Sequence, residues 1–347
     1  MRAAFIAGHG GNGVVAFGDR PMPPFDQGSV LVRMKAASLN RVDLYMRDSG
    51  AGITHNLPQI MGVDGAGVVE AVDDPASGLS PGQPVILYPA SVCGRCEWCL
   101  AGETMLCVQV RYLGEHRDGT MADFVRVPAG NLFAMPDGLD FGKGAALGVA
   151  YLTAWRMLFT RAAVRPGETV LIFGIGGGVS LAALQLAQMV GVRVFVTSRD
   201  DAKLARAVEM GADRGLRSDE DVVAHVVELT GGRGVDVVIE NVGEAVWPIA
   251  LRSVARGGRI ITCGATTGDR PSADLRRLFV RQIIVMGSTL GTHAEFARLL
   301  SCCGQGRIAP LIGRRFPLEE IHAALDTIEA GSQFGKCVVD IDQDSNG

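Results

Sequence analysis

The sequence predicts an α/β protein with two domains, a β-rich domain followed by a doubly wound parallel sheet. Up to about Ala90 the chain reads as short strands that glycine and proline interrupt. From Thr169 onward, strand patterns alternate with helical patterns, as they do in βαβ units. The 347 residues are too many for one ordinary core and suit two domains.

Composition narrows the classes of partner. The net charge is −4 with both signs interspersed, so we expect no basic groove for nucleic acid. No apolar run is long enough to span a membrane, and Met1–Phe5 enters a strand pattern without a signal-peptide core. These features favour a cytoplasmic protein with no membrane partner.

Short strands account for most of the first domain, which we place at residues 1–150. The strand-like segments are Val30–Ala36, Val68–Val72, Pro84–Leu87 and Gly119–Val127. No helical period of useful length interrupts them before about Ala90. We therefore expect this domain to be rich in β-strands.

The second domain, residues 151–290, begins with helical spacing over Ala150–Ala163, which Pro166-Gly167 ends. Its predicted strands are Val170–Phe173, Val192–Thr197, Val235–Glu240, Arg259–Cys263 and Ile283–Gly287. Its predicted helices are Asp201–Met210, Asp219–Thr230 and Ala245–Ala255. Residues 291–347 add a helix to about Cys303, a helix over Leu318–Ala330 and a strand over Lys336–Ile341, and we expect them to return to the first domain.

A glycine-rich turn follows the first strand of the parallel sheet. Gly174, Gly176, Gly177 and Gly178 let the backbone turn sharply and approach a ligand, and a helix-like run follows. Free N–H groups at the start of that helix suit a pyrophosphate. In the fingerprint G-x-G-x-x-G the third glycine would fall at Val179, so a purely structural turn is the alternative. The position of the turn in the alternating sheet favours a dinucleotide.

Four cysteines lie close together in a lobe at about residues 91–108. Cys93, Cys96, Cys99 and Cys107 have the spacing of a tetrahedral zinc site, and four thiolates leave no open position for a substrate. We therefore predict one structural Zn²⁺. Free buried thiols and an iron–sulfur cluster are the alternatives.

Residues at the end of the second predicted strand of the parallel sheet, Val192–Thr197, indicate which dinucleotide the chain prefers. Ser198 and Arg199 stand where enzymes that use NAD place an acidic residue, and Lys203 follows one helical turn later. Serine and arginine can bind a 2′-phosphate, so these three residues favour NADP(H) over NAD(H). In the alternative, Arg199 is solvated and Asp200 or Asp201 binds the ribose.

With these patterns in place, the chain resembles the medium-chain dehydrogenase/reductase superfamily over nearly its whole length. The segments Gly62–Val69 and Gly119–Phe124 and the glycine turn occur in the expected order. The resemblance implies a GroES-like catalytic domain and a Rossmann cofactor domain. It also implies a homodimer, formed through about Ile283–Gly287, or a tetramer.

Two branches of this superfamily differ in their catalytic residues. Where zinc alcohol dehydrogenases have catalytic zinc ligands, the chain has Asn40, Val63 and about Val149, and Val42 replaces the hydroxyl residue that relays a proton. The pattern Asn40-x2-Asp43-x-Tyr45 is instead similar to that of quinone oxidoreductases. The resemblance thus implies hydride transfer without a catalytic metal.

This branch implies an NADPH-dependent reductase whose small-molecule substrate is a quinone or an α,β-unsaturated carbonyl. Asn40 and Tyr45 would stabilise the enolate, Asp43 would orient its neighbours, and His116 would line the substrate pocket. The alternatives are an alcohol dehydrogenase that acts on an alcohol/aldehyde pair, and a non-catalytic NADPH-binding protein. The further cofactor-binding residues that we predict are Thr153, Asn241, Gly264, Ala265, Thr266, Ser288, Thr289, Leu290 and Lys336.

Overall fold

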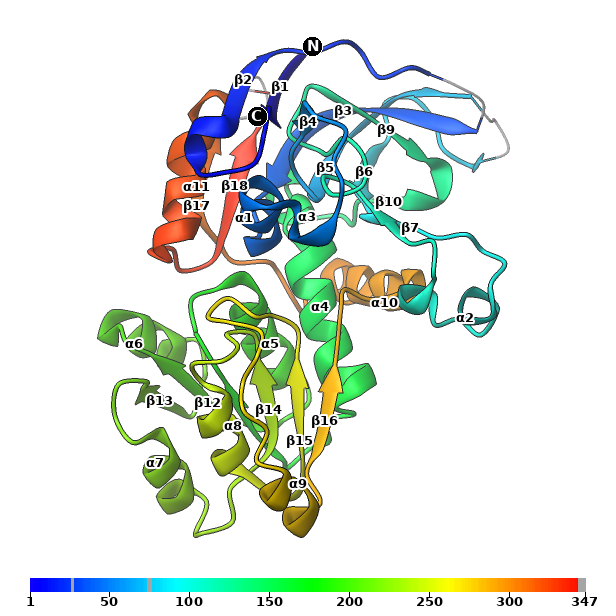
Figure 1. Ribbon diagram of the computed structural model, residues 1–347. Coiled ribbons are helices and arrows are strands. Elements are labelled where there is room, and N and C mark those ends of the chain that lie inside the picture. The colour runs from blue at the N-terminus through cyan, green and yellow to red at the C-terminus, as the bar shows by residue number, and fades with distance from the viewer. Residues whose placement is uncertain (26–27, 74–76, 343–347) are drawn as a thin grey trace. The chain divides into compact units, whose positions relative to one another are not determined.

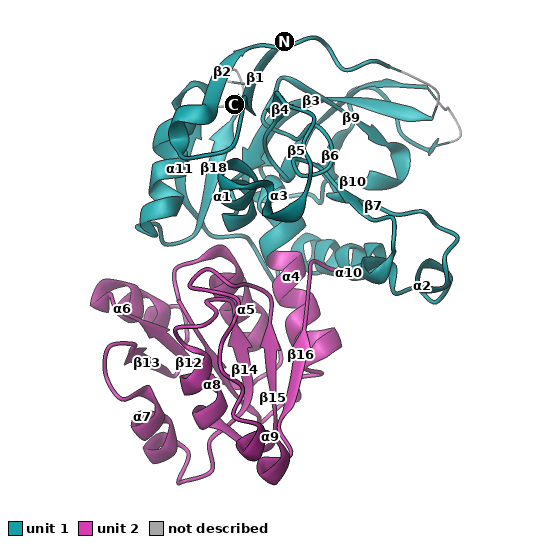
Figure 2. Cartoon of the chain, viewed as in Figure 1, with its two compact units in different colours: residues 1–150, 292–347 teal, residues 151–291 magenta. Residues whose placement is uncertain are grey.

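The computed structural model describes residues 1–25, 28–73 and 77–342. The chain forms two compact units, one of residues 1–150 and 292–347 and the other of residues 151–291 (Figures 1 and 2). Within the described ranges, we find no helix with the length and apolar character that a membrane span requires.

Unit 1 is built mainly from antiparallel strands. They are β1 (Arg2–Ile6), β2 (Val15–Asp19), β3 (Ser29–Ser38), β4 (Gln59–Ile60), β5 (Asp64–Val72), β6 (Pro84–Leu87), β7 (Ala90–Ser91), β8 (Arg111–Tyr112), β9 (Phe124–Pro128), β10 (Leu132–Ala134), β17 (Ile312–Pro317) and β18 (Lys336–Asp340). The main sheet has the order β10-β6-β5-β3-β18-β17, and β9 also pairs with β3. The strands β2-β1-β4 and β7-β8 form two small sheets.

The helices of unit 1 are short except near the C-terminus. They are α1 (Arg41–Asp48), α2 (Glu97–Leu100), α3 (Phe141–Ala145), α10 (His293–Gly304) and α11 (Ile321–Ala330). Helix α11 packs against β17 and β18 (Figure 1). Its buried face, which includes Ile321, Leu325 and Ile328, joins the core beneath the main sheet.

Strand β3 is the centre of the main sheet because it pairs with β5, β9 and β18. A bulge in the β3–β5 register brings the two backbones very close together. A Cβ atom at Gly67 would lie 2.2 Å from the carbonyl oxygen of Arg33. Glycine is therefore required at this point of β5.

Unit 2 contains the predicted parallel sheet. Its strands are β11 (Thr169–Ile172), β12 (Arg193–Ser198), β13 (Arg214–Arg217), β14 (Val235–Glu240), β15 (Val254–Thr262) and β16 (Ile284–Gly287). Its helices are α4 (Leu152–Trp155), α5 (Gly178–Gln188), α6 (Asp201–Glu209), α7 (Val222–Leu229), α8 (Trp247–Ser253) and α9 (Leu275–Arg281). The strand order β13-β12-β11-β14-β15-β16 reverses direction between β11 and β14, which is the switch point of a Rossmann sheet.

The predicted α/β class is confirmed: unit 1 is rich in strands, and unit 2 contains a parallel six-stranded sheet of Rossmann type. The residues Val170, Leu171 and Ile172 are fully buried, as expected of a strand that is covered on both faces.

Several elements lie outside the predicted segments, β17 among them, and three of these have a local explanation. Helix α1 contradicts the prediction that no useful helical period precedes Ala90. The helix has only two turns, and its buried residues include Asp43 and Arg47, so polar residues interrupt its apolar period. Strand β13 and helix α9 also lie outside our predicted segments, because both are short and rich in arginine.

Candidate functional site

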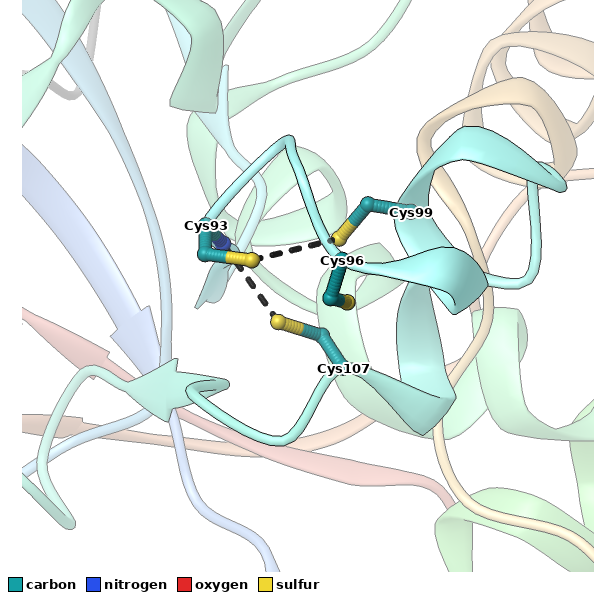
Figure 3. A group of neighbouring side chains, drawn as sticks. All are labelled: Cys93, Cys96, Cys99 and Cys107. Carbon is teal, nitrogen blue, oxygen red and sulfur yellow. Dashed lines mark hydrogen bonds between the residues drawn. The ribbon is translucent and has the colours of Figure 1, made fainter.

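The four-cysteine lobe forms one compact cluster. The Sγ atoms of Cys93, Cys96, Cys99 and Cys107 all lie within 4.8 Å of one another, and α2 follows Cys96 directly (Figure 3). Cys93 Sγ lies 3.9 Å from Cys99 Sγ. Tetrahedral zinc with Zn–S bonds of about 2.3 Å separates its sulfurs by roughly 3.8 Å, so the cluster fits zinc. The predicted structural zinc site is confirmed in its four ligand residues.

The protonation of these thiols depends on their surroundings. The backbone N–H groups of Arg95 and Cys96 lower the pKa of Cys93 to about 6, whereas burial raises the pKa of Cys99 to about 12. A bound dication favours the thiolate at both positions.

The second candidate site lies at the start of α1. The Asn40 N–H donates to Asp43 Oδ2 at 2.8 Å, an N-terminal contact that begins the helix. The Asn40 side chain forms hydrogen bonds both as donor and as acceptor. Its Nδ2 donates to Asp64 Oδ2 at 2.8 Å, and its Oδ1 accepts from Lys336 Nζ at 2.5 Å. The amide that we predicted to face a substrate therefore holds two buried charged groups.

Asp64 is the acceptor at the centre of this cluster. Its Oδ2 also accepts from Ser38 Oγ at 2.9 Å, and Lys336 Nζ lies 3.4 Å away. Burial raises the pKa of Asp64, and the Lys336 ammonium, Asn40 and Ser38 act against that rise. The sequence alone did not identify Asp64 or Ser38 as site residues.

The residues around Asn40 do not fit a catalytic zinc. Among the side chains that the structure describes, the four cysteines are the single group of three or more His, Cys, Asp or Glu residues with closely spaced ligand atoms. In the Asn40 cluster, Asp64 Oδ1 is a buried oxygen with no hydrogen-bond partner, while Val63 offers no donor atom. A catalytic zinc needs three protein ligands.

Two carboxyl groups near this cluster have unusual protonation. Burial raises the pKa of Asp43 to about 7, and the charge of Asp64 adds to the rise. Burial also raises the pKa of Glu115 to about 7, and the charge of Asp43 adds to it. In both groups burial is the main cause of the raised pKa. Sequence reasoning missed Glu115, since only the folded chain brings it near Asp43.

Tyr45 and His116 lie in different surroundings. Tyr45 lies on α1 and is half-buried. The ring of His116 accepts a hydrogen bond from the Tyr112 N–H at 3.2 Å, and burial lowers its pKa. His116 thus stabilises its own loop.

In unit 2 the glycine turn connects β11 to α5. Gly174 and Gly176 have φ angles of 67° and 113°, which only glycine adopts freely. Gly177 is the N-cap of α5 and has no side chain to cap the helix, so the first turn, which contains Gly178 and Val179, presents its backbone N–H groups. Val179 lies inside the helix, where a third glycine is unnecessary for the turn.

The neighbouring strand end at the switch point is tied to this turn. Asn241 Nδ2 donates to Ser180 Oγ at 2.9 Å, and Ser180 Oγ donates to the Phe173 carbonyl at 3.0 Å. Glu240, which is fully buried, accepts from the N–H groups of Val242 and Gly243 and from Thr262 Oγ1. Glu240 and Ser180 were not among the predicted cofactor residues, although both shape the loops at the carboxyl ends of the strands.

The remaining predicted cofactor residues occupy different surroundings. Ser288 follows β16, and its N–H donates to Thr262 O at 2.9 Å. Gly264 passes close to Asn241, because a Cβ atom there would lie 2.8 Å from the Asn241 carbonyl oxygen. Thr153 is buried in α4, Ala265 and Thr266 lie in the loop after β15, and Thr289 and Leu290 follow Ser288.

The end of β12 is arranged around Asp200. Its Oδ1 accepts from the N–H groups of Ala202 and Lys203 and so caps α6. The Asp200 N–H donates to Ser198 Oγ at 3.1 Å, so Ser198 is already engaged, while Arg199 is exposed. A carboxylate therefore lies at the end of this strand, two residues beyond the position that we had assigned.

Comparison with known proteins identifies the family. Residues 26–137 match the alcohol dehydrogenase GroES-like domain, and residues 178–304 match the zinc-binding dehydrogenase family. An alcohol dehydrogenase of Geobacillus stearothermophilus is 31% identical over 324 residues, which cover 93% of this chain and 94% of that protein. The chain belongs to the zinc-type alcohol dehydrogenases of the medium-chain dehydrogenase/reductase superfamily.

Solved structures of this family agree with the fold. An NAD-dependent alcohol dehydrogenase superposes with a TM-score of 0.95 and is 38% identical, with 99% of this chain and 100% of that chain covered. A thermostable alcohol dehydrogenase from Pyrobaculum aerophilum superposes with a TM-score of 0.89 and is 32% identical, with 98% and 99% covered.

These relatives contradict our interpretation of the chain as an NADPH-dependent reductase of quinones or α,β-unsaturated carbonyls. That interpretation was wrong, and the alcohol dehydrogenase alternative agrees better with the findings. Part of the reason is visible in the fold. The Asn40-x2-Asp43 pattern is satisfied by the start of α1 and by the buried Asp64–Lys336 pair, so it does not by itself indicate a substrate.

The zinc site leads to a first prediction. Cys96→Ser removes one thiolate, so we expect zinc content to fall well below one ion per chain and the Tm to fall by about 5 °C or more. The measurements are metal analysis and thermal unfolding. The control is Cys302→Ser, since Cys302 lies on α10 outside the cluster. Full zinc content and an unchanged Tm in Cys96→Ser would contradict the structural role.

The raised pKa values of Asp43 and Glu115 lead to a second prediction. Between about pH 4 and 7 the folded chain keeps protons on Asp43 and Glu115 that the unfolded chain has released, so stability should fall as the pH rises through this range. Glu115→Gln should reduce that slope by up to about 1.4 kcal/mol per pH unit. Urea unfolding at pH 5, 6 and 7 measures it. Glu209→Gln, an exposed substitution on α6, should leave the slope unchanged; an equal effect of both variants would contradict the assignment.

Proposed function

We propose that the chain is an NAD(H)-dependent oxidoreductase that transfers a hydride between the nicotinamide and the carbinol carbon of an alcohol/carbonyl pair. The observation that carries this proposal is the similarity of the whole chain, at 38% identity, to an NAD-dependent alcohol dehydrogenase. The glycine turn at the switch point supports it, because this is where a Rossmann sheet holds a pyrophosphate.

The cofactor site in this proposal includes the turn and the loops beside it. The first turn of α5 receives the pyrophosphate, and Asn241 and Ser180 hold the adjacent loop in place. The residues after β15 and β16 supply backbone groups to the ribose and the nicotinamide. The members of this set are Gly174, Gly176, Gly177, Gly178, Val179, Asn241, Gly264, Ala265, Thr266, Ser288, Thr289 and Leu290.

The preference for NAD(H) rests on Asp200. Its carboxylate lies at the N-terminus of α6, directly after the strand whose end meets the adenosine ribose in a Rossmann sheet. A carboxylate at this place accepts a hydrogen bond from a ribose hydroxyl and repels a 2′-phosphate.

At the substrate side, we propose Tyr45 as the group that passes the alcohol proton to solvent, because a phenol can both accept and donate a proton. Asn40 and Asp43 act as positioning residues, since their mutual contact starts the helix that carries Tyr45.

A direct assay tests the function. Purified protein should reduce NAD⁺, measured as absorbance at the NADH band, when it is offered a panel of primary and secondary alcohols. Asp200→Ser keeps a helix-capping side chain but removes the charge, so we expect the ratio of kcat/KM for NADP⁺ to that for NAD⁺ to rise about tenfold, equivalent to about 1.4 kcal/mol. Asp269→Ser, at an exposed residue, is the control. Turnover of no alcohol or carbonyl with NAD(H) would refute the proposal, and an unchanged cofactor ratio in Asp200→Ser would refute the role of Asp200.

We also propose that two copies associate along β16. This strand is an edge of the parallel sheet, and Ile284 and Val285 on it are 48% and 40% exposed. The adjacent helix α9 exposes Leu275, Phe279 and Val280. An edge strand flanked by apolar side chains is a ready surface for pairing with a second copy.

This association gives a prediction about mass in solution. Ile284→Lys places a charge on the edge, so light scattering after gel filtration should show wild type as a dimer or tetramer and the variant shifted toward monomer. Val208→Lys, an exposed apolar position on α6, is the matched control and should not change the mass. A monomeric wild-type protein would contradict the proposal.

A further inference from the structure

The cluster around Asn40 contains the buried ammonium group of Lys336, which has an acceptor for each of its N–H donors. Lys336 is 3% exposed, and its Nζ donates to Leu39 O at 2.8 Å and to Asn40 Oδ1 at 2.5 Å, and lies 3.4 Å from Asp64 Oδ2. A lysine ammonium has three N–H donors, and three acceptors are present. Asp64 is fully buried, so each charge compensates the other in a place without water access.

The sheet register brings these residues together. Val338 of β18 pairs with Ser38 of β3, and Ser38 pairs on its other side with Asp64 of β5. Lys336 begins β18, and the antiparallel register places it beside the chain that leaves β3 at Leu39 and Asn40. Three neighbouring strands therefore converge on one ion pair inside unit 1.

We infer that the Lys336 ammonium is the resident cation of the Asn40–Asp64 site and the positioning residue of the reaction centre. Its hydrogen-bond partner Asn40 stands, by the family resemblance, where zinc alcohol dehydrogenases have a catalytic zinc ligand, and we expect the chain to bind one zinc ion, at the four cysteines. The inference rests on the proposed function only in placing the reaction centre at the start of α1.

Electrostatics disfavours a zinc ion beside this ammonium. A dication at the Asn40 cluster would lie close to Lys336 Nζ in a buried, weakly screened site. By the family resemblance, the expected zinc ligand positions are Asn40, Val63 and about Val149, and none of them carries a thiolate, an imidazole or a carboxylate. Asp64 Oδ1 remains without a hydrogen-bond partner, but one oxygen does not supply the three protein ligands of a catalytic zinc.

Lys336 positions the start of α1 through its hydrogen bonds. Its bonds to Leu39 O and Asn40 Oδ1 fix the residues directly before α1, and Asn40 is the N-cap of that helix. Lys336 therefore controls the orientation of the helix that carries Tyr45. The three acceptors around Nζ all belong to unit 1, so the inference assigns Lys336 to the start of α1 in place of the cofactor role that the family resemblance implied.

The first test measures metal content in the wild-type protein, so it needs no substitution. After incubation with excess Zn²⁺ and removal of unbound metal, we expect about one zinc per chain in the wild type. Two zinc ions per chain, with one lost in Asp64→Asn and retained in Cys96→Ser, would overturn the inference.

The second test is a double-mutant cycle. Lys336→Met and Asp64→Asn each leave one buried group without its partner, so each should lower the Tm by about 10 °C. The double variant Asp64→Asn/Lys336→Met is neutral and should lose clearly less than the sum of the two. If a single variant does not fold, the double variant should still fold. Additive losses, or a double variant that is also unfolded, would overturn the ion-pair role.

The matched control is the more exposed Lys35–Asp342 pair, which joins the same sheet to the chain after β18. Lys35→Met should change the Tm by no more than about 2 °C, because exposed ion pairs contribute little.

The third readout separates positioning from cofactor binding. In Lys336→Met, or in the double variant, kcat should fall at least tenfold while the Kd for NADH, measured by fluorescence, stays within twofold of wild type. A Kd that rises tenfold in a folded variant would overturn the inference and return Lys336 to the cofactor. Zinc content and Tm do not depend on turnover, so a failure of the proposed alcohol/carbonyl activity is distinguishable from a failure of this inference.

Discussion

The register of β3 against β5 and β18 is the constraint on which unit 1 depends. It pairs Ser38 with Asp64 on one side and with Val338 on the other, which brings Lys336, two residues before Val338, next to the residues that leave β3 and begin α1. A buried carboxylate and a buried ammonium tolerate few alternative arrangements, because a slip of one residue would leave both without partners. The close approach at Gly67 enforces the same register from the β5 side.

Unit 2 relies on buried hydrogen bonds at the carboxyl ends of its strands. Glu240 is buried at the end of β14 and accepts from two backbone N–H groups and from Thr262, which ties the loop after the strand to the sheet. Asn241 then reaches Ser180 in the first turn of α5. These contacts hold the glycine turn and the neighbouring loop rigid, and a dinucleotide site needs a preformed backbone cradle more than it needs charged side chains.

Sequence reasoning was accurate where a local pattern has one physical meaning. The four cysteines have a spacing that few structures other than a metal site satisfy, and alternating strands and helices require a parallel sheet. It was less decisive where one pattern has two explanations. Asn40-x2-Asp43 was interpreted as a substrate motif, and in the fold it also begins a helix and contacts a buried ion pair. Ser198-Arg199 was interpreted as a phosphate site, and in the fold the hydroxyl of Ser198 accepts from the N–H of Asp200, which caps α6 at the same strand end.

The sequence by itself determined the two-part α/β architecture, the glycine turn and the zinc lobe, because each depends on residues that are close together in the chain. Only the tertiary structure decided which groups meet around Asn40, because Asp64 and Lys336 come from strands far away in the sequence and are joined by sheet register. The raised pKa values of Asp43 and Glu115 have the same origin, since burial and the approach of a distant charge are properties of the folded chain.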